Sequence, residues 1–111
     1  MTTALNVFRT VTANLITTPT LLYTAPINVT SILLSVQVTN VSSNVVGTTF
    51  YHTSVAGANT YLAQNFQVPY NDAAAIVAGK LVLETGQSIS GSATQNGSLQ
   101  IIISLLETAN Q

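Results

Sequence analysis

Few side chains in this sequence could do chemistry. The only histidine is His52, which with Ser54 and Asp72 could nominally form a Ser-His-Asp triad. His52 lies within an expected strand, and Ser54 is not part of the Gly-x-Ser-x-Gly spacing of a nucleophile elbow. The sequence therefore predicts no catalytic residues and a protein that is not an enzyme.

Metal and cofactor sites are equally poorly supported. The acidic residues Asp72, Glu84 and Glu107 are scattered along the chain, and there is no cysteine. Zinc sites need closely spaced histidine or cysteine ligands, and calcium sites need clustered oxygen ligands. No glycine-rich loop of the kind that cradles a nucleotide phosphate is present. We therefore expect no metal and no cofactor.

The composition indicates a protein that is buried in an assembly. Of the 111 residues, 47% are hydrophobic and only 5% are charged, where a soluble domain carries about 25% charged residues. Threonine, serine, asparagine and glutamine must form the surface, and they supply little charge repulsion between copies. The net charge of −1 gives no attraction to nucleic acid, and no apolar run is long enough to span a membrane. Neither nucleic acid nor a membrane is expected as a partner.

Alternating hydrophobic residues predict an all-β fold, either an antiparallel β-sandwich or a jelly roll of about eight strands. Residues 1–14 are expected to form an N-terminal arm or first strand, and residues 15–111 the sandwich, within a single domain. The clearest strand of the first half covers 32–41. Its expected inward face is Ile32, Leu34, Val36 and Val38.

Breaker residues divide the second half of the chain. Pro69 ends an expected strand over 61–68, in which Phe66 is predicted to point inward. Asp72 is a suitable helix N-cap, and Gly79 is a suitable C-terminal stop. These signals predict one short helix near 72–78.

The end of the chain predicts a β-hairpin over 89–106. Asn96-Gly97 lies between two alternating runs, and both residue types accept a positive φ. A two-residue loop would place serines opposite the apolar residues. A three-residue loop with Gly97 left-handed is therefore expected, with the pairs Ile89–Ile103, Gly91–Ile101 and Ala93–Leu99.

Eight residues are candidates for contacts between subunits. Ile102 and Leu106 lie on the second face of the last strand, so a second sheet or another subunit should cover them. Lys80 and Glu84 share one strand face and form either a solvated pair or an ion pair between subunits. The full set is Phe8, Arg9, Tyr61, Tyr70, Lys80, Glu84, Ile102 and Leu106.

Several motifs resemble those of small virion structural proteins of tailed bacteriophages, in particular capsid decoration (cement) proteins. They are Leu22-Tyr23-Thr24-Ala25-Pro26, Val68-Pro69-Tyr70-Asn71-Asp72-Ala73, the run from Gly79 to Ile89, and the closing Ile103-Ser104-Leu105-Leu106-Glu107-Thr108. The resemblance covers most of the chain after about Thr18. It implies a β-sandwich or jelly roll that assembles as trimers or larger rings on a virion.

Composition and resemblance together give one leading hypothesis. It is a non-enzymatic capsid decoration protein, a homotrimer that is made in the bacterial host cytoplasm and located in the virion. Its partners would be the major capsid protein or other virion proteins. The alternatives are a neck, collar, tail, baseplate or fibre component, or a carbohydrate-binding adsorption module in which tyrosines stack on sugar.

Overall fold

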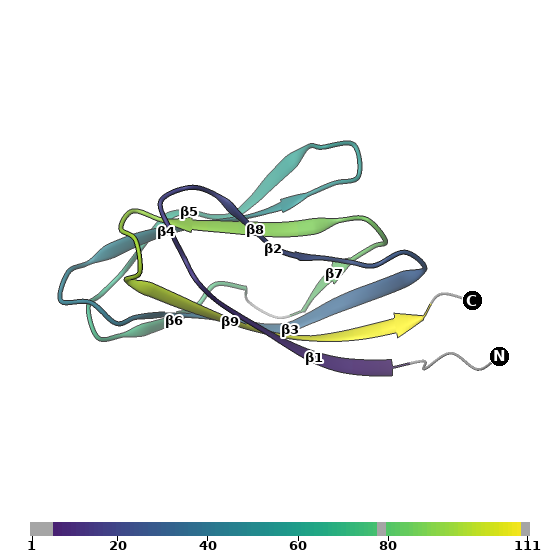
Figure 1. Ribbon diagram of the computed structural model, residues 1–111, viewed down its shortest axis with the longest axis horizontal. Helices are drawn as coiled ribbons and strands as arrows, with labels where there is room; N and C mark the ends of the chain where they lie inside the picture. Colours follow the sequence, from purple (N-terminus) through teal and green to yellow (C-terminus); the bar gives the residue numbers. More distant parts are fainter. Residues whose placement is uncertain (1–5, 78–79, 110–111) are drawn as a thin grey trace.

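The computed structural model describes residues 6–77 and 80–109, which form two antiparallel sheets packed face to face (Figure 1). Sheet A has the order β1-β9-β3-β6, with β7 also paired to β3, and sheet B has the order β2-β8-β4-β5. The first and last strands of the described residues lie side by side in sheet A. The expected all-β sandwich is confirmed, with nine strands in the described residues. Their bounds are β1 Asn6–Asn14, β2 Thr20–Thr24, β3 Val29–Asn40, β4 Val46–Thr53, β5 Asn59–Val68, β6 Ala73–Ala75, β7 Leu81–Leu83, β8 Ser88–Ala93 and β9 Leu99–Ala109.

The core lies between the two sheets and follows the period of two that a strand imposes on its side chains. In β9 the odd-numbered residues point inward, and Leu99, Ile101, Ile103 and Leu105 are all buried. Sheet B closes the core from the other side, where Phe50 is the largest fully buried side chain. Residues in β9 with even numbers therefore form the outer face of sheet A.

Gly91 in β8 allows side chains from three segments to meet over sheet B. A Cβ atom built at this position would lie 3.2 Å from Leu22 Cδ1, 3.3 Å from Phe50 Cδ1 and 3.5 Å from Leu15 Cδ2. The hydrogen atom of glycine thus leaves the space that these three apolar side chains fill.

The predicted hairpin over 89–106 is wrong. β8 pairs with β2 and β4 in sheet B, while β9 pairs with β1 and β3 in sheet A. The predicted pairs Ile89–Ile103, Gly91–Ile101 and Ala93–Leu99 therefore do not exist as strand neighbours. The alternation of apolar and polar residues identified the buried residues of β8 and β9 correctly. It cannot show whether two such strands pair within one sheet or face each other from two sheets. The positive φ of Gly97 is confirmed at 72°, within a connection that crosses from one sheet to the other.

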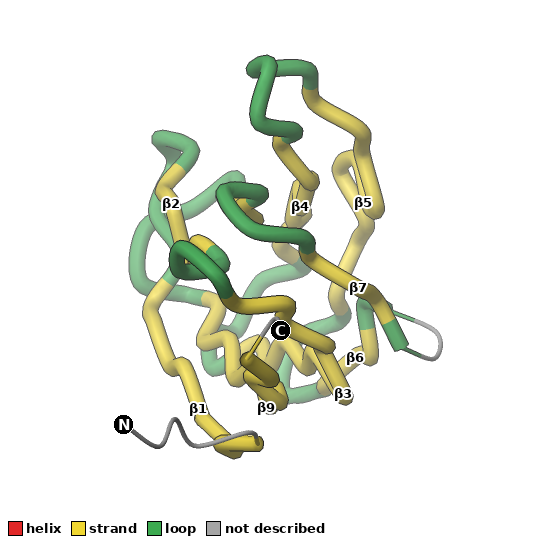
Figure 2. Tube along the Cα trace, turned by 90° about the vertical axis from the view of Figure 1, so that its right-hand side faces the viewer, coloured by secondary structure: helices red, strands yellow, loops and turns green. Residues whose placement is uncertain are grey.

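The predicted helix near 72–78 is also wrong, and Figure 2 shows only strands and loops in the described residues. Ala73–Ala75 forms β6, which pairs with Gln37–Thr39 of β3, and the Ile76 N–H extends this contact to the Val36 carbonyl oxygen. A helix of one or two turns gains too few hydrogen bonds to offset its nucleation, whereas the edge of β3 supplies partners immediately. Residue 78 lies outside the described residues.

Bulges shift the register of two strands. In β3 the register against β9 shifts between Leu33 and Ser35, so Leu33 is buried and Ile32 moves to the outer face. The predicted inward face is therefore correct for Val36 and Val38 and wrong for Ile32. Leu34 lies within the bulge and is only partly buried. In β5 the register shifts twice against β4, but Phe66 lies opposite the buried Thr48 and therefore shares the inner face, as expected. Its side chain is still 46% exposed, because β5 is the edge strand of sheet B.

Replacing Gly91 with valine tests this packing. The added side chain must displace Leu22, Phe50 and Leu15, so Gly91→Val is expected to lower the free energy of unfolding by about 1–3 kcal/mol. Urea unfolding followed by circular dichroism measures this loss. The control Ser35→Val, at an exposed strand position, should change stability by about 0.5 kcal/mol or less. Equal effects of the two variants would contradict the packing argument.

Candidate interaction surface

An apolar row crosses the outer face of sheet A. Strand pairing places Phe8 of β1 opposite Leu106 of β9, Leu106 opposite Ile32 of β3, and Ile32 opposite Val82 of β7. These four side chains, which we call the outer row, share one face because residues directly opposite each other in paired strands do so. They come from both ends and from the middle of the sequence, and only the folded sheet brings them together.

The outer row is solvent-accessible at both of its ends. Phe8 is 73% exposed and Val82 is 51% exposed, while Leu106 and Ile32 between them are partly covered. Lys80 and Glu84 are also exposed and share the strand parity of Val82, one residue beyond each end of β7. A contiguous apolar stripe with polar neighbours is typical of a surface that contacts another protein.

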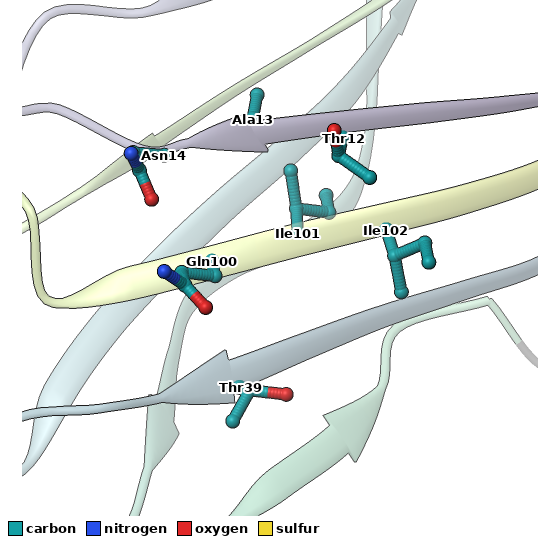
Figure 3. Close-up of a pocket in the computed structure, with 7 residues that line it drawn as sticks. All are labelled: Thr12, Ala13, Asn14, Thr39, Gln100, Ile101 and Ile102. Carbon is teal, nitrogen blue, oxygen red and sulfur yellow. The ribbon is translucent and has the colours of Figure 1, made fainter.

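A shallow depression lies beside the outer row on the same face. Thr12 and Asn14 of β1, Gln100 and Ile102 of β9, and Thr39 of β3 line it, together with Ala13 and Ile101 (Figure 3). Its only exposed large apolar side chain is Ile102, which is 42% exposed. The short polar side chains around Ile102 give the depression hydrogen-bonding groups and no net charge, which favours a protein contact over a charged ligand.

One charged cluster joins the two sheets. Glu107 faces the inside of the sandwich with a side chain that is only 9% exposed, and the Arg9 Nε–H donates to its Oε1 at 2.6 Å. The Tyr23 hydroxyl donates to Glu107 Oε2 at 2.5 Å. Since that hydroxyl has a single proton, the Ser31 hydroxyl donates to the Tyr23 oxygen at 2.6 Å. The cluster thus connects β1, β2, β3 and β9.

The cluster shifts the pKa values of its members in opposite directions. Burial raises the pKa of Glu107, but hydrogen bonds from Tyr23 and Arg9 and the Arg9 charge outweigh it, so that the pKa lies below the usual 4.5. Burial and the hydrogen bond to Glu107 raise the pKa of Tyr23 to about 12. Glu107 is therefore held as a carboxylate and Tyr23 as a neutral donor at neutral pH, an arrangement that suits a structural link.

The described residues contain no group of side chains that could hold a metal ion. His52 forms a hydrogen bond with Gln87 at 3.2 Å, and the Asp72 carboxylate accepts one from its neighbour Ala73. No group of three or more histidine, cysteine, aspartate or glutamate side chains comes together in residues 6–77 and 80–109. The same ranges contain no helix that could cross a membrane.

The structure brings together some of the predicted interface residues and separates others. Five lie on or beside the outer face of sheet A, whereas Tyr61 lies in β5 against the Tyr51 ring at 5.3 Å, and Tyr70 follows β5. Arg9 forms its ion pair within its own chain. The five on or beside sheet A are Phe8, Lys80, Glu84, Ile102 and Leu106. Whether any of the eight contacts another subunit stays a prediction.

Sequence reasoning missed Ile32 and the partners of Glu107. Ile32 was assigned to the core because no sequence signal revealed the bulge after Leu33. The sequence does contain a signal for Glu107. It occupies an odd-numbered position of β9, where the other residues are apolar and inward, and a carboxylate buried there requires a hydrogen-bond donor. Tyr23 could not have been identified as that donor, because it comes from the other sheet.

Neither a family model nor a curated protein matches this sequence. Among solved structures, the fold is similar to a chain described under "Bacillus endospore appendages form a novel family of disulfide-linked pili", with a TM-score of 0.57 and 10% identity over 96% of this chain and 88% of that one. A chain of infectious bursal disease virus, Gt strain, has a TM-score of 0.48 and 14% identity over 95% of this chain and 32% of that one. At these identities the similarity concerns the fold alone.

The charged cluster predicts a characteristic dependence of stability on pH. The lowered pKa of Glu107 gives stability that is present above pH 4.5 and lost as the pH falls below it. The raised pKa of Tyr23 gives stability that is present below pH 10 and lost as the pH rises toward about 12. Glu107→Gln, which removes the carboxylate that two donors share, should cost about 1–2 kcal/mol at pH 7 and flatten the acid limb.

Urea midpoints measured across the pH range check both limbs. Tyr23→Phe should remove the alkaline limb and also weaken the acid limb, because the Tyr23 hydroxyl helps to lower the pKa of Glu107. Glu84→Gln, a change to an exposed carboxylate, is the matched control for Glu107→Gln. An acid limb that is unchanged in Glu107→Gln would show that other groups cause it.

Proposed function

We propose that this protein is a non-enzymatic structural subunit of a virion, and specifically a capsid decoration protein that assembles as a homotrimer on the head of a tailed bacteriophage. The observation that carries the proposal is the outer row, an apolar stripe aligned across four strands and open to solvent at Phe8 and Val82. Burying this stripe against another subunit would be favourable, because each Å² of apolar surface removed from water contributes about 25 cal/mol.

The low charge supports the same proposal. Of the five charged side chains, Arg9 and Glu107 neutralise each other within the chain, which leaves Lys80, Glu84 and Asp72. Lys80 and Glu84 flank Val82, where they could orient a partner without opposing its approach. The major capsid protein, or another virion protein, would cover the part of this face that the trimer contact leaves open.

Copy number separates this proposal from a neck, collar, tail, baseplate or fibre component. A decoration protein is expected at hundreds of copies in each particle, and a neck or tail-tip component at a few. Quantitative mass spectrometry of purified particles, with the major capsid protein as the reference, measures this ratio. A few copies in each particle would contradict decoration and favour the alternatives.

A carbohydrate-binding adsorption module has one observation in its favour. Tyr61 is 51% exposed at the edge of sheet B, and its ring lies beside that of Tyr51 at a tilt of 43°. Exposed aromatic rings can stack on sugar faces. This site offers one pair of rings, whereas the outer row aligns four apolar side chains across one face of sheet A, so the structural role is favoured.

A charge placed in the outer row tests the role of this face. Val82→Glu would bury an unpaired carboxylate in the proposed contact, so incorporation into particles is expected to fall about tenfold or more. Val55→Glu is the matched control, since Val55 is also an exposed valine but lies in the loop after β4. Circular dichroism confirms that both variants fold. Equal incorporation of both variants would overturn the assignment of this face.

A further inference from the structure

The edges of the two sheets differ in their protection against pairing with another strand. Bulges, proline, lysine and short length normally protect an exposed edge. In the described residues, β5 has two register shifts and a positive φ of 51° at Asn65, and β2 is a five-residue strand with a register shift. The edge of sheet A beyond β3 is divided between β6 and β7, three residues each, with Lys80 adjoining β7.

β1 has none of these protective features. Its nine residues, Asn6–Asn14, contain no proline or lysine and pair with β9 in one unbroken register. Its single charged residue, Arg9, binds Glu107 of the same chain. A long edge without bulges, proline or lysine is a ready template for another strand.

The backbone groups that β1 presents at this edge follow from the ladder on its other side. The Leu15 N–H donates to the Leu99 carbonyl oxygen at 2.9 Å, and this pair continues the β1–β9 register. Antiparallel alternation then directs the N–H and C=O groups of odd-numbered residues toward β9 and those of even-numbered residues away from it. No strand of the described residues pairs with β1 on that side.

We propose that this edge of β1 pairs with β1 of a second copy, antiparallel, across a two-fold axis at Thr10. The outward N–H and C=O groups belong to the even-numbered residues of β1. The two copies can therefore form hydrogen bonds only in registers that place even-numbered residues opposite each other. Among these, the register centred on Arg9 places two arginines directly opposite each other, which is unfavourable. The register centred on Thr10 avoids this and pairs all nine residues of each strand.

The same register covers an exposed aromatic side chain. Phe8 of one copy would lie opposite Thr12 of the second copy, and Thr12 is itself opposite Ile102 in sheet A. The outer row of one copy thereby continues into the depression of the other, and the two A sheets become one. This edge contact is additional to the proposed trimer contact through the outer face and does not depend on it.

Cysteine cross-linking tests the two-fold pairing directly. The chain has no cysteine, so Thr10→Cys introduces a single thiol. Opposed residues of a hydrogen-bonded pair have Cα atoms about 5.5 Å apart, which is within the range for a disulfide. Oxidation with diamide is expected to give a covalent dimer of twice 11.6 kDa on a denaturing gel.

Ser35→Cys is the matched control for this experiment. Ser35 is exposed and lies in the same row of sheet A as Thr10, since both are opposite Ser104. It is two strands away from the β1 edge and should remain monomeric on the gel. Cross-linking of Thr10→Cys that is no faster than that of Ser35→Cys would overturn the proposal.

Opposite charges at the axis give a second test. Thr10→Lys and Thr10→Glu each place two like charges opposite each other, so each variant alone should have a lower mass by light scattering than the unmodified protein. Mixing the two variants should restore the mass, because a lysine then faces a glutamate. Full mass for either variant alone would overturn the pairing. Val82→Glu leaves β1 unchanged, so the two proposals can fail separately. Unchanged particle incorporation of Val82→Glu together with cross-linking of Thr10→Cys would refute the role of the outer face and leave the β1 pairing in place.

Discussion

The strand that the rest of the structure depends on is β9, because it carries apolar side chains on both faces and is paired on both sides. Its odd-numbered side chains fill the core against sheet B, and its even-numbered side chains include Ile102 and Leu106 on the outside. Hydrogen bonding to β1 on one side and to β3 on the other holds both sets in position. A second sheet covers only one face of such a strand within a two-sheet monomer. The apolar side chains on its other face are the basis of the proposed contact with another subunit.

The buried carboxylate of Glu107 interrupts that pattern and determines where β1 and β2 attach. A charge on the inner face of a strand is costly unless donors surround it, and here they come from Arg9 and Tyr23. These donors bring a strand of sheet A and a strand of sheet B to the same point. The cluster therefore links the two sheets through hydrogen bonds at this end of the molecule, in addition to their apolar packing.

The sequence predicted the fold class, most strand positions and most buried positions, since these depend on local alternation. It failed where the outcome depends on distant segments. The Asn96-Gly97 signal was taken as a hairpin turn, but the chain instead crosses between sheets, and Ala73–Ala75 became a strand because β3 offered an edge. The outer row was only partly predicted: Phe8 and Leu106 were identified as candidates, but Ile32 requires knowledge of a bulge. Its alignment across four strands exists only in the register of the folded sheet.

The position of β9 between β1 and β3 also has a consequence for the timing of synthesis. The last strand of the described chain is inserted between two strands that leave the ribosome much earlier, so sheet A cannot close until residue 109 has been made. Before that moment Phe8 and Ile32 lack Leu106 between them, and β1 lacks the neighbour that holds it flat. Before residue 109 has been made, a nascent chain therefore cannot complete the outer row or hold β1 in its sheet.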